Sequence, residues 1–256
     1  MKIASTLSLL YAAAIAGALT IATVLYLSWD EFALFEETQK SAMQKSVRAA
    51  HGSVGKLIAG QASLVEAFAG EHGELLQATV ENSTDLAKQV QLMQLVGAYF
   101  PEHLNYAVRS SNGEVYLGKP EPDARESCLV DMAAHADFLI ENASPSQAAY
   151  KSALRYRPAL HSIPDSHFCT MASWRTDEGG NGLLMISFPP EPLVRTLEAH
   201  EVFGHQLLLL RSEPDNLIEV TSKGTRENIQ REGFLSPEEL QTLFVRLPVE
   251  GSRWDI

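Results

Sequence analysis

The first turns of the chain lead into a long stretch without charge. Residues 3–29, a run of 27, contain no charged side chain. As a helix this run reaches about 40 Å, which exceeds the roughly 30 Å hydrocarbon core of a bilayer. Lys2 precedes the run, and Asp30 and Glu31 follow it. Because positive charge stays on the cytoplasmic side, the sequence predicts a transmembrane anchor over residues 1–29 that exports the remainder.

A cleaved signal peptide is the alternative interpretation of this segment. Its apolar core spans about 7 to 15 residues and ends at small residues before the cleavage site. The alanine-rich stretches at 12–14 and 16–18 offer such sites, but the apolar run continues past Ala18. An uncleaved anchor therefore fits the length better, and both interpretations export residues 30–256.

The exported part is large enough for one sizeable domain or two small ones. The net charge is −12, without a cluster of Lys and Arg. Nucleic-acid binding requires basic side chains that neutralise phosphates, so we expect no nucleic-acid partner. No later apolar run is long enough to cross back through the membrane.

Helical patterns dominate residues 30–100, which we interpret as a stalk and a second helix. From Met43 to Phe68 apolar residues recur at alternating steps of four and three, interrupted by Gln61. This seam fits either a partner helix or the protein's own core. Residues 82–85 are typical of a helix start, and the apolar residues that follow mark one face of the predicted helix, made of Leu86, Val90, Met93 and Val96.

Strand patterns dominate residues 101–256. Residues 104–108 and 114–117 flank an Asn112-Gly113 turn and predict a hairpin. Ser236-Pro237-Glu238-Glu239 is a capping box that opens a helix through Phe244. The other expected helices span residues 126–141 and 191–199, and the other expected strands span residues 158–163, 167–174, 183–188, 206–210, 217–221 and 253–256. This order predicts an α+β fold with an antiparallel sheet and inserted helices.

Several of these segments resemble one family of proteins. They are His167-Phe168 and residues 182–188, 204–210, 233–240 and 247–256. They are similar to the Cache-like (periplasmic PAS-like) extracytoplasmic sensor regions of bacterial membrane-bound signalling proteins, especially diguanylate cyclases. The resemblance implies a sensor domain of residues 101–256 that binds a small molecule in the periplasm and signals through the inner membrane.

The sequence departs from that family in one large respect. A second transmembrane run and the Gly-Gly-(Asp/Glu)-Glu-Phe cyclase signature do not occur in it. We therefore expect no catalytic residue in this chain. Either it is the input part of a longer receptor, as we expect, or its output passes through a partner. We also expect no cofactor and no metal. The apolar strand at residues 253–256 is expected to be cut short.

The ligand pocket is expected in a basic and aromatic cluster. Arginine binds carboxylates in a bidentate manner, and aromatic rings hold amines or other rings. The predicted ligand-binding residues are Tyr156, Arg157, His161, His167 and Trp174. The alternative is a set of surface arginines and packed aromatic side chains.

Two further features concern Cys128 and Cys169. Outside the cytoplasm the pair is a disulfide candidate, and the alternative is two unrelated buried thiols. His161, Asp165, His167 and Cys169 also lie near one another in the sequence, but their spacing fits no common zinc pattern.

The sequence thus predicts a single-pass sensor that binds a small ligand and forms a homodimer through its N-terminal helix. A conformational signal would pass along that helix to the membrane. The first alternative is an inner-membrane accessory or assembly protein that binds another protein. The second, a membrane-tethered metal-dependent hydrolase, would bring His161, His167 and a carboxylate together around a metal.

Overall fold

The computed structural model describes residues 2–118, 155–157, 167–211, 216–225, 233–250, 252 and 254–256. By its internal contacts the chain forms two compact units, Met1–Lys45 and Ser46–Ile256. The predicted domain boundaries after residues 29 and 100 stay predictions. Each compact unit is described separately below.

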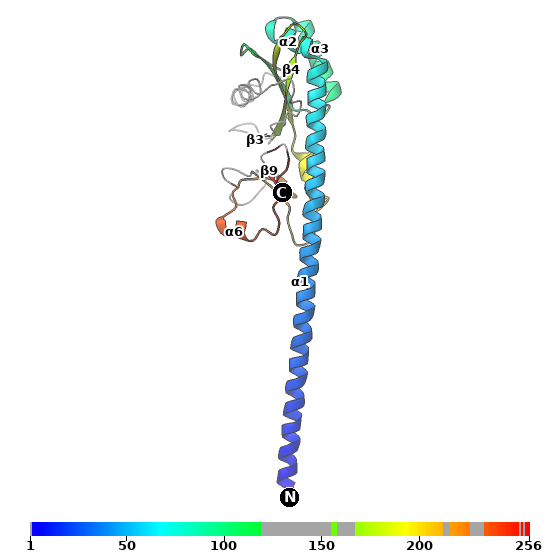
Figure 1. Cartoon of the computed structure of the whole chain (residues 1–256), viewed down its shortest axis with the longest axis vertical. Helices are drawn as coiled ribbons and strands as arrows, with labels where there is room; N and C mark the ends of the chain where they lie inside the picture. The colour runs from blue at the N-terminus through cyan, green and yellow to red at the C-terminus, as the bar shows by residue number, and fades with distance from the viewer. Residues whose placement is uncertain are drawn as a thin grey trace. The chain divides into compact units, whose positions relative to one another are not determined.

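Helix α1 (Lys2–Glu71) is the longest element and begins in the first unit (Figure 1). Many large apolar side chains between Ile15 and Phe35, such as Leu19, Leu25 and Trp29, are exposed to solvent. Among the described residues, α1 is the helix whose length and apolar composition suffice to cross a membrane. The exposed apolar surface is the kind that a lipid phase covers.

In the second unit, the continuation of α1 contributes one face to a hydrophobic core. Ala50, Val54, Ile58, Val65 and Phe68 are buried there. Three positions of the predicted seam, Ala50, Val54 and Phe68, therefore pack inside the protein. Leu64, another seam position, is exposed.

Two short helices follow α1. Helix α2 (Gly73–Glu81), which the sequence did not predict, packs on the first sheet. Its first residue fits closely, because a Cβ at Gly73 would lie 2.2 Å from the carbonyl oxygen of Arg175.

Helix α3 (Leu86–Tyr99) begins where the sequence predicted, at the N-cap Asp85. The Asp85 carboxylate accepts hydrogen bonds from the backbone N–H groups of Ala87 and Lys88. The apolar face that the sequence marked is buried at one of its four positions. Val96 is buried together with Leu92, whereas Leu86 (71 % exposed), Val90 and Met93 face solvent.

The first sheet has five antiparallel strands in the order β2-β1-β5-β4-β3. Strands β1 (Asn105–Ser110) and β2 (Val115–Leu117) form the predicted hairpin, and Gly113 adopts a φ of 90° in its turn. The long central strands are β4 (His167–Arg175) and β5 (Asn181–Phe188), as the sequence predicted. The edge strand β3 (Arg155–Arg157) pairs with the start of β4.

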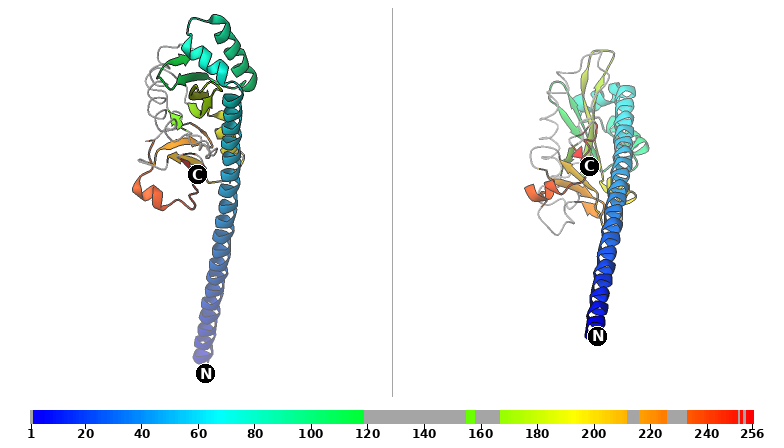
Figure 2. Two further views of the ribbon diagram at one scale, coloured as in Figure 1. Left: turned by 45° about the horizontal axis from the view of Figure 1, so that its top comes forward. Right: turned by 60° about the horizontal axis from the view of Figure 1, so that its bottom comes forward.

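Helix α5 (Glu191–Glu198) leads from β5 to a second sheet of four antiparallel strands, in the order β8-β7-β6-β9. Its strands are β6 (Leu208–Arg211), β7 (Ile218–Thr221), β8 (Gly224–Thr225) and β9 (Trp254–Asp255). The sequence predicted a single antiparallel sheet, and the structure has two. Figures 1 and 2 show both sheets on the same side of the α1 segment that follows Ser46.

The region of the second sheet also contains a capped helix and two ion pairs. Helix α6 (Pro237–Gln241) begins with the predicted capping box, in which Ser236 and Glu239 exchange side-chain and backbone hydrogen bonds, but it ends before Phe244. The fully buried Glu219 forms an ion pair with Arg211, whose Nη2 lies 2.6 Å from Oε1. Arg246 and the buried Asp255 form a second pair.

One hydrophobic core joins these parts of the second unit. It includes residues of α1, α2, α3, α5 and both sheets, with the large side chains Phe68, Phe168, Trp174 and Trp254. The first sheet therefore packs one face against this core and leaves its opposite face for a second, smaller cluster.

Candidate ligand-binding site

The smaller cluster lies on the face of the first sheet opposite the one that packs against α1, α2, α3 and α5. Successive residues of a strand point to opposite faces, so one face of β1, β4 and β5 carries the core and the other carries this cluster. We call the second face the methionine face, and define it by five buried residues: Ala107, Cys169, Met171, Leu183 and Met185.

The centre of the methionine face is a row across three strands. Met185 of β5 lies opposite Ala107 of β1 on one side and opposite Met171 of β4 on the other. Val115 and Leu117 of β2 pack at the edge of the cluster. Methionine side chains adapt to irregular shapes, so this row forms an apolar floor of adaptable side chains.

A polar margin borders the floor at one end. Ser187 lies opposite Cys169, and the Ser187 Oγ is 3.4 Å from the Cys169 Sγ. His167, at the start of β4, shares the face with Cys169 by strand alternation and is partly buried.

Arg109 of β1 carries a positive charge at the end of the methionine face that lies away from Ser187. It shares the face with Ala107 by alternation and lies opposite Leu183 of β5 and Val115 of β2. The Nε atom of Arg109 is buried. A guanidinium group next to an apolar floor is suited to hold a carboxylate, because it donates parallel hydrogen bonds to both oxygens.

The predicted site residues fall into three groups. His167 lies on the methionine-face side, and the backbone register places Arg157 opposite His167 and Tyr156 opposite Phe168. His161 lies outside the described residues. Trp174 is on the other face: it is seven residues from His167 on one strand, and an odd separation reverses the side.

Trp174 serves the core rather than a common site with His167. Its side chain is 1 % exposed and belongs to the core that contains the helices. It covers Gly182, where a Cβ would lie 2.4 Å from the indole Cζ2. Sequence proximity to the basic cluster suggested a ligand contact, but β4 carries this ring to the face opposite the polar margin.

Arg109 and Ser187 were absent from the predicted site. The sequence did not single out either residue as a ligand contact, because they reach the methionine face through the pairing of β1 and β5, which are far apart in the sequence. Arg109 and Ser187 are each two residues from an apolar residue of the same strand, Ala107 and Met185, and therefore lie on the same face as these residues. This pattern identifies the site only when the strand register is known.

The cysteine and metal hypotheses extend beyond the described residues. Cys169 is buried on the methionine face, whereas Cys128 lies outside the described residues, so the disulfide stays a prediction. His161 and Asp165 of the metal hypothesis also lie outside them. Within the part of the chain that the structure describes, no three His, Cys, Asp or Glu side chains gather as metal ligands do.

Tyr106 of β1 has a buried phenol group on the core face of the first sheet. Burial raises the pKa of Tyr106, and the neighbouring Tyr116 raises it further. The Tyr106 ring is 1 % exposed and closely covered, since a Cβ at Gly118 would lie 2.1 Å from it. This tyrosine therefore stays neutral and acts in packing.

Comparison with known proteins gives a match of fold. Neither a protein-family model nor a curated protein matches the sequence. Solved structures do match, among them the sensory domain of the Campylobacter jejuni chemoreceptor Tlp3 with isoleucine bound. That domain is 13 % identical, the match covers 80 % of this chain and 79 % of the other, and the TM-score is 0.51.

Two further structures of the ligand-binding domain of Tlp3 from Campylobacter jejuni match similarly. The complex with L-valine is 12 % identical over 79 % of this chain and 78 % of the other, with a TM-score of 0.52. The complex with 4-methylisoleucine is 11 % identical over 78 % and 75 %, also with a TM-score of 0.52. At these identities the likeness concerns the fold. The predicted Cache-like α+β fold is confirmed: this chain folds as the sensory domains of such chemoreceptors do.

Proposed function

We propose that this chain is the extracytoplasmic sensor part of a bacterial membrane receptor and binds a small ligand on the methionine face. The observation that carries the proposal is a fully buried apolar floor with Arg109, His167 and Ser187 at its margin. Binding sites for small molecules combine apolar walls with a few placed polar groups. The chain makes or breaks no bond in this proposal.

The ligand class follows from the same chemistry. Arg109 offers charge-assisted hydrogen bonds to a carboxylate, and Met171 and Met185 offer contact with an aliphatic group. An aliphatic α-amino acid presents both parts. The similar Tlp3 domains were solved with isoleucine, L-valine and 4-methylisoleucine, which supports this class as the first to be tested.

The location follows from the charges that flank the apolar part of α1. Lys2 stands before it and Asp30 and Glu31 after it, so the second unit is exported to the periplasm and α1 anchors it in the inner membrane. The chain is then a single-pass membrane protein. Residues 30–256 form the exported portion.

The receptor is a homodimer through α1 in this proposal. Gly52, Gly60 and Gly70 of α1 each have open space around the position of a Cβ, and α1 is exposed there. Small residues let a second helix approach closely. Ligand binding shifts the balance between two arrangements of the dimer, and α1 carries the shift to the membrane. A diguanylate cyclase is the output domain that the family resemblance implies.

A titration of the full chain in detergent tests the ligand site. Isothermal calorimetry with L-valine and L-isoleucine should give saturable binding to the wild type. Hydrogen bonds to a charged group contribute about 1.5–3 kcal/mol, so Arg109→Ala should weaken binding by about tenfold or more. Arg48→Ala, which removes an exposed arginine from α1, is the matched control and should bind as the wild type does. Equal affinities for wild type and Arg109→Ala would remove Arg109 from the site.

A protein-binding role is the second candidate function. One observation favours it: Leu86, Val90 and Met93 form an exposed apolar stripe on α3, with spacings of four and three residues. An inner-membrane accessory protein would use such a stripe to bind its partner. Absence of binding for every small amphiphilic acid tested, together with loss of assembly in Val90→Ser, would favour this role.

A further inference from the structure

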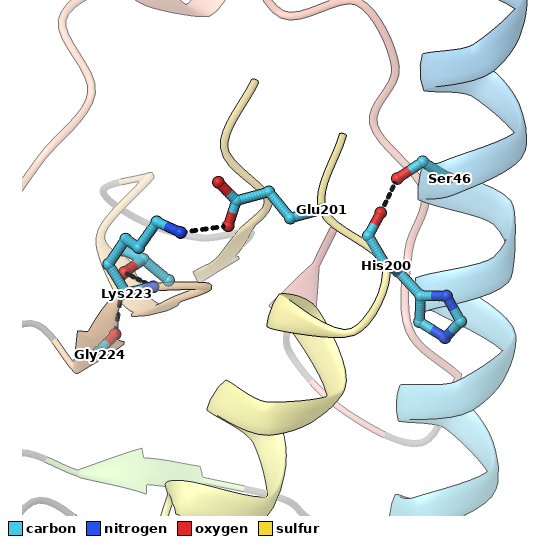
Figure 3. Close-up of polar contacts among 6 residues, drawn as sticks. Ser46, His200, Glu201, Lys223 and Gly224 are labelled. Atoms are coloured by element: carbon cyan, nitrogen blue, oxygen red, sulfur yellow. Dashed lines mark hydrogen bonds and ion pairs between the residues drawn. The ribbon is translucent and has the colours of Figure 1, made fainter. Parts of the chain in front are cut away.

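The segment that follows α5 occupies a central position in the second unit. Helix α5 leaves the first sheet after β5, and residues 199–207 lead on to β6 of the second sheet. His200 and Glu201 lie at the start of this connection, where the chain passes between α1 and the second sheet (Figure 3). Their side chains extend to opposite sides.

His200 contacts α1 at two points. The Ser46 hydroxyl donates a hydrogen bond to the carbonyl oxygen of His200. The Ser53 Oγ lies 2.9 Å from the Nε2 atom of the His200 ring. Ser46 and Ser53 are seven residues apart, which is two helical turns, so both hydroxyls are on one face of α1. His200 is therefore fixed to α1 through its backbone and its side chain.

Glu201 contacts the second sheet. Its carboxylate lies 3.0 Å from the Nζ atom of Lys223, in the turn between β7 and β8. The Thr221 hydroxyl holds this turn, because it accepts from the backbone N–H of Lys223 and donates to the carbonyl oxygen of Gly224. The neighbouring side chains of Ser222 and Lys223 lower the pKa of Glu201, so the carboxylate is ionised at neutral pH.

A third contact reinforces the same stretch of α1. The Nε2 atom of His51 lies 2.9 Å from the carbonyl oxygen of Pro248. The neighbouring Leu247 and Val249 pair with the β9 segment through backbone hydrogen bonds. Residues 46–53 of α1 are thus connected by side-chain hydrogen bonds to two separate parts of the second-sheet region.

We propose that His200 and Glu201 form a coupling junction, which passes a ligand-induced displacement of the first sheet through α5 to residues 46–53 of α1. This inference rests on the proposed function. The physical basis is that α5 follows directly from β5, the central strand of the methionine face, and ends at the two residues that hold α1 and the β7–β8 turn. Both residues are positioning residues and contact no ligand.

Hydrogen exchange measured by mass spectrometry on the full chain in detergent tests the junction. Ser46→Ala/Ser53→Ala removes both α1 hydroxyls. Ser41→Ala/Ser63→Ala, which changes two exposed serines of the same helix, is the matched control. L-valine is the probe. In the wild type and control, L-valine should slow exchange in β4 and β5 and change it in residues 46–58. In Ser46→Ala/Ser53→Ala, the change in β4 and β5 should persist and the change in residues 46–58 should be lost.

A ligand-free arm separates failure of the junction from failure of the proposed function. Each of the two hydrogen bonds contributes about 1 kcal/mol, so Ser46→Ala/Ser53→Ala, which removes both, should speed exchange of residues 199–207 roughly 30-fold without ligand. Lys223→Ala should speed exchange of the same residues, whereas Lys56→Ala, at an exposed position of α1, should not. If L-valine changes exchange nowhere in the wild type, the proposed ligand class is wrong. The measurements without ligand still test whether the junction exists.

Two results would overturn the junction. The first is a response of residues 46–58 to L-valine that survives in Ser46→Ala/Ser53→Ala. The second is unchanged exchange of residues 199–207 in both that variant and Lys223→Ala. Thermal unfolding of each variant, compared with its control, shows whether the fold is intact.

Discussion

Gly182 is the position at which a single added methyl group tests the packing of the first sheet most severely. It lies on β5 between Ser110 of β1 and Trp174 of β4. A Cβ there would be 2.0 Å from the carbonyl oxygen of Arg109 and 2.4 Å from the Trp174 Cζ2, whereas ordinary contacts begin at 3.4 Å. Both distances fall short by 1.0 Å or more, and both neighbours are held in the sheet or the core.

The magnitude follows from these contacts. Overpacking a core costs about 1–3 kcal/mol, and two rigid neighbours place Gly182→Ala at the upper end, about 3 kcal/mol. For a domain of this size, 1 kcal/mol corresponds to about 2–4 °C, so the melting temperature should fall by about 6–12 °C. Differential scanning calorimetry of the full chain measures this shift.

Gly97→Ala is the matched control, because it makes the same chemical change where nothing lies within 4 Å. Gly97 is inside α3, where alanine is favoured by about 0.5–1 kcal/mol over glycine. The melting temperature should therefore rise by about 1–4 °C. A Gly182→Ala protein as stable as the wild type would refute the description of how β1, β5 and Trp174 pack.

Three further variants test charged groups at two sites. Burial raises the pKa of Glu66, so the folded state favours its neutral form, and the resulting stability is lost as pH rises through the folded pKa. Glu66→Gln should consequently raise the melting temperature at pH 7 and leave it nearly unchanged below the ordinary value of 4.5; an equal shift at both pH values would contradict this. Arg211→Ala removes the ion-pair partner of the buried Glu219 and should cost about 3–5 kcal/mol in urea unfolding, whereas Arg211→Met/Glu219→Leu should cost less. The reverse order of stability would refute the charge argument.

Local signals in the sequence predicted the local structure well. The Asn112-Gly113 turn and the capping box at Ser236 both depend on neighbouring residues alone, and both occur as predicted. The long apolar run predicted a helix that is long enough for a membrane. These features require no knowledge of distant parts of the chain.

The sequence was less informative about which residues are buried and which strands pair. Helix α3 carries two apolar stripes, and periodicity identified the exposed one, which contains Leu86, instead of the one that contains Leu92. Helical period establishes that a helix is amphipathic, but the tertiary partner decides which stripe is buried. Likewise, the predicted strands did not reveal that β6 begins a second sheet, because pairing partners are set by long-range contacts.

The candidate site shows the same limit at the level of single residues. Strand alternation alone would have separated His167 from Trp174, since their positions are seven residues apart on one strand and an odd separation reverses the face. Arg109 and Leu183, by contrast, meet only through the register of β1 and β5. A site assembled by such pairing is visible in the structure and has no contiguous motif in the sequence.

The most direct measurement is the methyl NMR signal of the methionines during a ligand titration. The full chain, labelled with [methyl-¹³C]methionine in detergent micelles, contains six methionines, and Met→Leu variants assign their signals. If the methionine face binds an aliphatic amino acid, the signals of Met171 and Met185 shift saturably with L-valine or L-isoleucine. The signal of Met93, exposed on α3, stays in place. Saturable binding that leaves Met171 and Met185 unshifted would contradict the proposed site.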